Sequence, residues 1–181
     1  MAAPRSTDRR LVVGLGNPGS DAEHTPHNAG RRVTRVLIAL LGARSGGDVA
    51  GSAVWTATRE GIEWTIAEPA TFMNESGPAV RALMAATGHR RSELVIVLDD
   101  SNLSQGAARF RASGSDGGHR GLRSVLTVLR SVEVARLRIG VGAAPAGVEL
   151  GDFVLSPMPP VAAKQLDRVA RLAAEALLAN R

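Results

Sequence analysis

Residues 94–100 read LVIVLDD, and this stretch carries the clearest strand signal in the 181-residue chain. Its five consecutive aliphatic residues, from Leu94 to Leu98, predict a strand that is buried on both faces. Asp99 and Asp100 follow at the carboxyl end of that strand. Because α/β proteins usually bind ligands outside the carboxyl ends of their strands, a functional site is expected at this end of the sheet.

Strand and helix patterns alternate on both sides of this central strand. In chain order they predict a strand at 11–13, a helix at 29–42, a loop at 45–51, hairpin strands at 53–58 and 62–67, and a helix that follows 76–78 and ends before 88. They go on to predict a strand at 107–112, a helix through 122–129, a strand at 136–141 and a closing helix at 161–178. This order favours an α/β sandwich with a mixed sheet. No repeat or linker divides the chain, so we expect one domain over residues 10–181, after a flexible polar N-terminus at residues 1–9.

The composition, 44% hydrophobic and 22% charged, is that of a globular protein. The absence of cysteine excludes disulfides, thiolate zinc sites, iron–sulfur clusters and a cysteine nucleophile, and it fits a reducing compartment. No apolar run approaches the roughly 20 residues of a membrane span, and the N-terminus lacks the apolar centre of a signal peptide. We therefore expect a cytoplasmic protein without a membrane partner.

The net charge is +5, and Lys164 is the only lysine among 22 basic residues. A basic excess favours a polyanionic partner such as nucleic acid, although an arginine-rich, lysine-poor composition also results from GC-rich codon usage. Aromatic residues make up only 3% of the chain, and tyrosine is absent. RNA binding through a platform of stacked aromatic rings is therefore not expected.

A glycine-rich loop at 14–19, GLGNPG, has the G-x-G-x-x-G spacing of dinucleotide-binding loops. The context is different, because Pro18 interrupts the loop and the helical pattern begins only near Ala29. No acidic residue closes a second strand about 20 residues further on. Nucleotide binding is therefore not favoured.

Two histidines and a carboxylate suggest acid–base chemistry. His27 precedes the first predicted helix, His119 lies in a second glycine-rich loop, and Asp99 ends the central strand. A histidine oriented by a carboxylate is a common general base, and it would activate water here because no nucleophile-elbow serine or cysteine is present. Asn74, after Phe72 and Met73, is either a turn and helix cap or an amide that binds a substrate carbonyl or positions water.

Arginine pairs alternate along two predicted strands. Arg109 and Arg111 flank Phe110, and Arg136 and Arg138 flank Leu137. Because residues two apart share a face of a strand, each pair points to one side of the sheet. Such pairs form either a solvated edge or a phosphate-binding patch.

Seven motifs together resemble the bacterial-type peptidyl-tRNA hydrolase family, from Leu11 to the final helix. They are VGLGNPG at 13–19, TPHNAG at 25–30, PATFMNESG at 69–77, VLDD at 97–100, GGHRGL at 117–122, RLRIGVG at 136–142 and FVL at 153–155. The resemblance implies a single three-layer α/β/α domain around a twisted mixed β-sheet. It also implies hydrolysis of the ester between a peptidyl or N-blocked aminoacyl group and the 3′ ribose of tRNA, by a monomer without a metal or organic cofactor.

The same resemblance implies roles for individual residues. By this match His27 is the catalytic base, Asp99 is its carboxylate partner, and Asn17 and Asn74 are the active-site amides. The substrate-binding positions are Phe72, Met73, Gly118, His119 and Arg120, and the tRNA-binding positions are Arg109, Arg111 and Arg138.

Four positions depart from the family pattern. Pro26 replaces an arginine, Ala22 a tyrosine, Asn102 an acidic residue and Arg120 an active-site asparagine. The catalytic pair is retained while its surroundings differ, so the chain is either a divergent housekeeping enzyme or a specialised paralogue that cleaves a particular aminoacyl- or peptidyl-tRNA. A non-catalytic RNA-binding protein on the same scaffold and a hydrolase of a non-tRNA ester or amide remain as alternatives.

Overall fold

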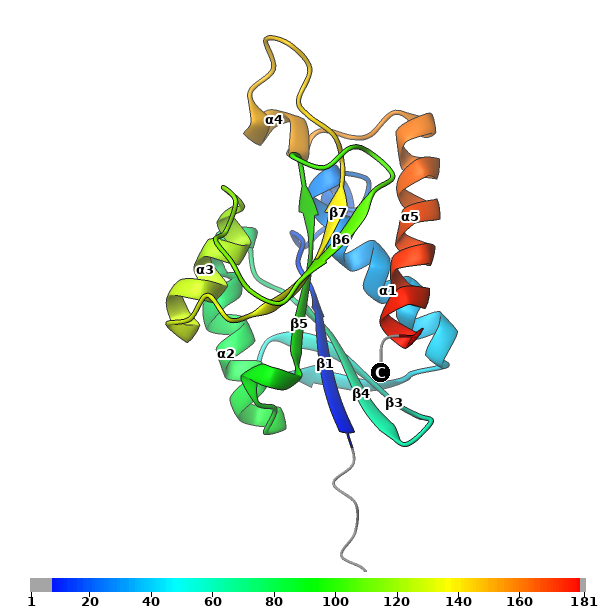
Figure 1. The fold of residues 1–181 in the computed structure, drawn as a ribbon, viewed down its shortest axis with the longest axis vertical. Coiled ribbons are helices and arrows are strands. Elements are labelled where there is room, and N and C mark those ends of the chain that lie inside the picture. Colours follow the sequence, from blue (N-terminus) through cyan, green and yellow to red (C-terminus); the bar gives the residue numbers. More distant parts are fainter. Residues whose placement is uncertain (1–7, 180–181) are drawn as a thin grey trace, which may run out of the picture.

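The structure is a computed structural model that describes residues 8–179, and a seven-stranded twisted sheet forms its centre (Figure 1). The strand order is β2-β3-β4-β1-β5-β7-β6. The strands are β1 (Asp8–Gly14), β2 (Arg44–Val49), β3 (Ser52–Arg59), β4 (Ile62–Pro69), β5 (Leu94–Asp100), β6 (Ala108–Arg111) and β7 (Ala135–Gly140). β4, β1, β5 and β7 are parallel neighbours, whereas β2, β3 and β6 pair antiparallel, so the predicted mixed sheet is confirmed.

Helices cover both faces of the sheet and make the three predicted layers. One layer holds α1 (Ala29–Leu41) and α5 (Pro160–Ala179), and the other holds α2 (Ser76–Thr87) and α3 (Arg120–Leu129) (Figure 1). A short helix, α4 (Leu150–Leu155), lies near the carboxyl end of β5. No helix among residues 8–179 is long and apolar enough to cross a membrane.

The hydrophobic core has two layers, one on each face of the sheet, because side chains of the central strands alternate between the two faces. In β5, Leu94, Ile96 and Leu98 pack against α2 and α3, while Val97 packs on the other face against α1 and α5. All four side chains are at most 2% exposed. Burying an aliphatic side chain stabilises the fold by about 1.5–3 kcal/mol, so this strand is a major source of its stability.

The start of α1 lies unusually close to the sheet because residue 30 is glycine. A Cβ atom at Gly30 would overlap the backbone carbonyl oxygens of Val97 and Leu15. This close approach sets the helix directly over the ends of β1 and β5. As a result, the turn that precedes α1 lies next to the carboxyl end of β5, where Asp99 is located.

Two predictions of local structure are wrong. Residues 45–51 are not a loop, because Arg44–Val49 forms the edge strand β2, which pairs with β3 through a bulge between Ser45 and Gly47. This strand is mostly exposed and contains two glycines, so it has none of the apolar alternation that identifies strands. β1 begins at Asp8, so residues 8 and 9 are not part of a flexible N-terminus; residues 1–7 lie outside the described part of the chain.

Candidate active site

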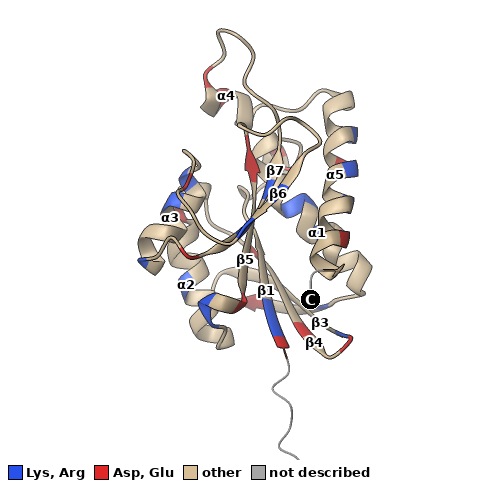
Figure 2. Cartoon of the chain, in the orientation of Figure 1, with Lys and Arg blue, Asp and Glu red and all other residues tan. Residues whose placement is uncertain are grey.

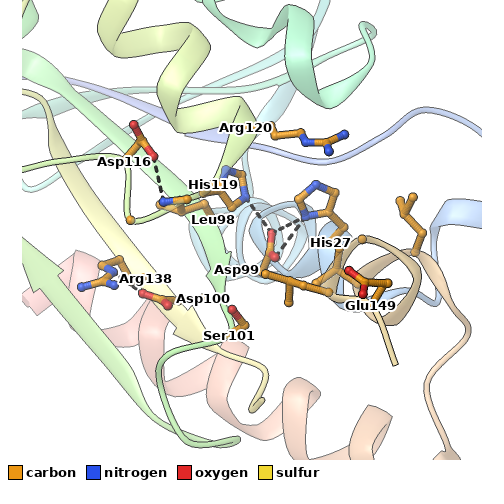
Figure 3. Close-up of a pocket in the computed structure, with 16 residues that line it drawn as sticks. His27, Leu98, Asp99, Asp100, Ser101, Asp116, His119, Arg120, Arg138 and Glu149 are labelled. Carbon is orange, nitrogen blue, oxygen red and sulfur yellow. Dashed lines mark hydrogen bonds and ion pairs between the residues drawn. The ribbon is translucent and has the colours of Figure 1, made fainter. Parts of the chain in front are cut away.

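His27 and Asp99 form a direct pair, the partnership that the family resemblance implied. His27 lies in a 3₁₀ turn, Pro26–Asn28, and its Nδ1 is 2.9 and 3.0 Å from the two carboxylate oxygens of Asp99 (Figure 3). An ionised carboxylate only accepts hydrogen bonds, so Nδ1 carries the proton. Nε2 therefore holds the ring's free lone pair, and it makes no hydrogen bond to any residue in the described range 8–179.

His119 binds the same carboxylate from the other side. Its Nε2 is 2.9 Å from Oδ1 of Asp99, and its Nδ1 accepts a hydrogen bond of 3.1 Å from the backbone N–H of Leu122. The centroids of the His27 and His119 rings are 5.0 Å apart. Burial would raise the pKa of Asp99, but the charges and hydrogen bonds of His119 and His27 outweigh it and hold that pKa well below its usual range. Asp99 is therefore ionised at all physiological pH values.

A cavity of about 320 Å³ opens beside this cluster. Six of the predicted site residues line it, namely His27, Asp99, Gly118, His119, Arg120 and Arg138. The rest of its lining comes from Leu98, Asp100, Ser101, Asp116, Gly117 and, around α4, Glu149, Leu150, Gly151, Val154 and Leu155 (Figure 3). The α4 segment was not predicted as a helix, since six residues are too few to show helical periodicity.

Asn17 connects the loops that surround the site. Its Oδ1 accepts a hydrogen bond of 2.8 Å from the backbone N–H of Met73. Asn28, next to His27, completes the connection: its side chain accepts from the backbone N–H of Asn17 at 2.7 Å and donates to the Asn17 carbonyl at 3.0 Å. Asn28 was not predicted as a site residue, although it stands beside His27 in one of the quoted motifs. These bonds leave Nδ2 of Asn17 as a spare donor.

Six of the predicted site residues do not line the cavity: Asn17, Phe72, Met73, Asn74, Arg109 and Arg111. Met73 is 4% exposed and belongs to the core layer under α2 and α3, which accounts for its absence from the cavity wall. Phe72 and Asn74, on either side of it, are exposed.

The arginines of β6 and β7 share one face of the sheet, but they differ in their contacts. Arg109 lies opposite Arg138 and Arg111 lies opposite Arg136 in the antiparallel ladder, so basic residues sit side by side on these strands (Figure 2). Arg136 is only 2% exposed, and it donates to the carbonyl oxygens of Gly114 and Val132. The interpretation of its pair as a solvated or phosphate-binding surface is therefore wrong for Arg136, because a loop covers it.

Arg138 forms an ion pair with the buried carboxylate of Asp100. Arg109 and Arg111, by contrast, are exposed, and neither forms an ion pair with a described residue. The exposed part of this basic surface is therefore on the edge strand β6.

His27, Asp99 and His119 place one polar atom each within 4.8 Å of the others, as a metal site would. A histidine that binds a metal through Nε2 carries its proton on Nδ1 and donates it to an acceptor. Nδ1 of His119 instead faces the N–H of Leu122, which is itself a donor. The donor set therefore suits a hydrogen-bonded proton network rather than a metal ion.

A buried ionised carboxylate that orients a histidine, whose second nitrogen is free beside a cavity, is the arrangement of an acid–base hydrolase that activates water. Comparison with known proteins specifies the family. Residues 11–180 match the family model of peptidyl-tRNA hydrolase. The chain belongs to the peptidyl-tRNA hydrolase family.

Individual relatives agree with this assignment. A peptidyl-tRNA hydrolase of Aquifex aeolicus is 38% identical over 171 residues, which cover 94% of this chain and 89% of the relative. One from Nocardia farcinica is 38% identical over 178 residues, covering 98% and 92%. The crystal structure of peptidyl-tRNA hydrolase from Acinetobacter baumannii superposes with a TM-score of 0.83 at 26% identity, covering 98% of this chain and 94% of that one.

Proposed function

We propose that this protein hydrolyses the ester between a peptidyl or N-blocked aminoacyl group and the 3′ ribose of tRNA, with His27 as the general base. The observation that carries the proposal is the pairing of His27 Nδ1 with Asp99, which leaves Nε2 free beside the cavity. Membership of the family and the shared name of its relatives supply the substrate class.

The chemistry needs only a positioned water and a base. Nε2 of His27 takes a proton from water as its oxygen attacks the ester carbonyl, and the resulting imidazolium is stabilised by Asp99. When the tetrahedral intermediate collapses, the carbon–O3′ bond breaks and the imidazolium returns the proton to the ribose oxygen. The products are the free N-blocked amino acid or peptide and tRNA with its 3′ hydroxyl.

The developing oxyanion requires hydrogen-bond donors, and two asparagines are suited to supply them. Oδ1 of Asn17 is already held by the backbone of Met73, so the amide is oriented and its Nδ2 is free to donate. Asn74 is exposed and its side chain has no described partner within residues 8–179, so it is available to a substrate that extends beyond the cavity. Gly118 lines the cavity with His27, and Phe72 is exposed beside Met73, so both are proposed to contact the acyl group.

Turnover on two esters tests the proposal. Purified protein is mixed with N-acetylaminoacyl-tRNA and, separately, with the methyl ester of the same N-acetylamino acid. We expect rapid release from tRNA and slow release from the methyl ester, since the tRNA contacts contribute binding energy. Equal rates on both would support a hydrolase of non-tRNA esters instead. We also propose that the protein is a monomer and that it is located in the cytoplasm. Sedimentation of the protein with and without tRNA would measure its oligomeric state.

Replacing Arg111 with alanine is expected to raise KM for tRNA esters with little change in kcat. Arg111 is exposed on β6 without an ion-pair partner in residues 8–179, so its charge is available to a phosphate. The slope of log K against log salt is expected to flatten by about one unit for each lost contact. Arg168→Ala, on the exposed side of α5, is the matched control. An unchanged slope for Arg111→Ala would show that this residue belongs to a solvated edge.

Arg138 requires a different substitution. Its removal would leave the buried carboxylate of Asp100 without its ion-pair partner, which destabilises the fold. A loss of activity in Arg138→Ala would therefore mix binding with stability. For this reason Arg111 is the better probe of tRNA contact, with Arg109→Ala as its neighbour on the same strand.

Replacing Arg120 with asparagine tests the alternative of a specialised paralogue. Arg120 is exposed, lines the cavity with His27 and forms no ion pair with a described residue (Figure 3). An arginine only donates hydrogen bonds and is permanently charged, so it favours an anionic group of the substrate. We expect Arg120→Asn to be more active than the wild type on neutral N-acetylaminoacyl-tRNA.

The same substitution should move the acidic limb of the pH profile of kcat/KM upward. Removal of one solvent-screened cation lets the imidazolium of His27 form more easily. The measurement compares wild type and Arg120→Asn on acyl groups with neutral and acidic side chains across pH. Identical preference and identical profiles would make Arg120 a neutral surface substitution and favour a housekeeping enzyme.

A further inference from the structure

We propose that His119 is a positioning residue with two separable tasks, and that it does not bind substrate. Its Nδ1 caps α3, and its Nε2–H holds the carboxylate of Asp99 in the orientation that His27 needs. This inference rests on the proposed function, because the carboxylate matters only if His27 is the base. It replaces the substrate-binding role that the sequence resemblance implied for His119.

The capping contact comes from the local structure of the α3 N-terminus. His119 is the N-cap residue of α3, with φ −78° and ψ 113°, and its side chain accepts from the backbone N–H of Leu122. The N-cap position normally takes Ser, Thr, Asp or Asn, so a histidine here needs another reason. Gly121 lies against the ring: a Cβ atom there would overlap Sδ of Met73 and would lie 3.1 Å from Cε1 of His119.

The cap determines where the proton of His119 resides. The N–H of Leu122 can only donate, so Nδ1 must offer its lone pair to it. In a neutral imidazole the proton then sits on Nε2, which is 2.9 Å from Oδ1 of Asp99. The backbone of α3 therefore imposes the tautomer that donates to the carboxylate.

Asp99 is held from two sides as a result. Oδ1 accepts from both His27 Nδ1 and His119 Nε2, each at 2.9 Å, and Oδ2 accepts from His27 at 3.0 Å. The side chains of His27, Asp99 and His119 are 12%, 4% and 9% exposed, so little solvent competes for these bonds. Both ring nitrogens of His119 are occupied by protein atoms, which leaves none for a substrate.

Other charged groups face the same cavity and contribute to its electrostatics. They are Arg120 from α3, Asp100 of β5 with its partner Arg138 of β7, Asp116 from the glycine-rich loop with its partner Arg123, and Glu149 before α4. None of the hydrogen bonds and ion pairs described for residues 8–179 joins these groups to Asp99. The two histidines are thus the direct partners of the carboxylate.

Two substitutions separate the two tasks. In His119→Asn, Oδ1 takes the place of Nδ1 and keeps the cap, but the side chain is too short to reach Asp99. In His119→Gln, the side-chain amide nitrogen of glutamine takes the place of the imidazole Nε2 and keeps the donor to Asp99. The cap on α3 is lost, because glutamine has no acceptor at the position of Nδ1. His24→Asn, at an exposed histidine outside the cavity, is the control.

The expected results are opposite for the two variants. His119→Asn should keep its Tm within a few degrees of wild type but lose about 10- to 100-fold in kcat, the size of one hydrogen bond to a charged group. The acidic limb of the pH profile of kcat for His119→Asn should move to higher pH. The reason is that an Asp99 carboxylate with one donor fewer stabilises the imidazolium of His27 more strongly. His119→Gln should stay within about threefold of the wild-type kcat, with its Tm lowered by about 2–4 °C through the lost cap. KM should change in neither.

Other outcomes would overturn the positioning role or restore substrate binding by His119. A wild-type kcat and pH profile in His119→Asn, or equal losses of kcat in both variants, would overturn the positioning role. A raised KM with unchanged kcat in both would restore substrate binding. If the wild type hydrolyses no peptidyl-tRNA, the proposed function fails, but NMR titration of the His27 ring still tests the inference. The titration midpoint should then move upward in His119→Asn and not in His119→Gln, and an unmoved midpoint would contradict it.

Discussion

Replacing His27 with alanine is expected to lower kcat on N-acetylaminoacyl-tRNA by about 10²–10⁴, the range for losing general acid–base catalysis. No other histidine can substitute for it: both nitrogens of His119 are held by Asp99 and Leu122, and His24 and His89 do not line the cavity. Steady-state kinetics of the purified variant give the measurement, with circular dichroism to show that it is folded.

The control for this substitution is His24→Ala, which removes an exposed imidazole outside the cavity. It should leave kcat unchanged. The affinity for tRNA should be the same in both variants, since neither histidine lies on the basic face of β6. A folded His27→Ala enzyme with near-normal kcat would show that another group activates the water.

Replacing Asp99 with asparagine is expected to lower kcat by roughly 10³–10⁴, the size of the loss when a catalytic histidine is left in the wrong tautomer. Two ring N–H groups, from His27 and His119, point at the carboxylate. An amide has one acceptor oxygen, and its N–H₂ group would face a second donor. One of the two rings must therefore rotate or change its tautomer. If His27 changes its tautomer, the proton moves from Nδ1 to Nε2, and Nε2 can no longer accept a proton from water.

Acid unfolding gives Asp99→Asn a second readout. The pKa of Asp99 is lower in the folded protein than in the unfolded chain, so its ionisation stabilises the fold above the unfolded value of about 4. That contribution is lost progressively as the pH falls below this value. Wild type should therefore lose stability between neutral pH and strong acid more steeply than Asp99→Asn. Equal acid dependence together with full activity would show that the carboxylate is not the partner of His27.

The central part of the fold was predictable because it depends on strong local signals. The five aliphatic residues of β5 and the 3.6-residue spacing in α1, α3 and α5 determine which faces are buried, and these elements lie where they were predicted. The edge strand β2 was missed, since its hydrogen bonds to β3 hold it in place and its side chains do not. Helix α4 was missed because six residues are too short for a pattern.

The candidate site was predictable only in part. The rule that sites lie at the carboxyl ends of strands located Asp99, whereas its pairing with His27 was implied only by the motif resemblance. The burial of Arg136 could not be predicted, because a loop 22 residues earlier in the chain covers it. The double hydrogen bonding of His119 likewise depends on the orientation of the α3 N-terminus, which the sequence pattern does not specify.

Single-turnover hydrolysis measured together with tRNA binding separates catalysis by His27 from binding of tRNA. Wild type and His27→Ala, each in excess over N-acetylaminoacyl-tRNA, are assayed for bound tRNA and for released acyl group in the same samples. We expect equal binding of tRNA, with complete release of the acyl group by wild type and at most about one hundredth of that rate in His27→Ala. A folded wild-type protein that binds the tRNA but releases no acyl group faster than buffer would rule out His27 as a general base and identify an RNA-binding protein without catalysis.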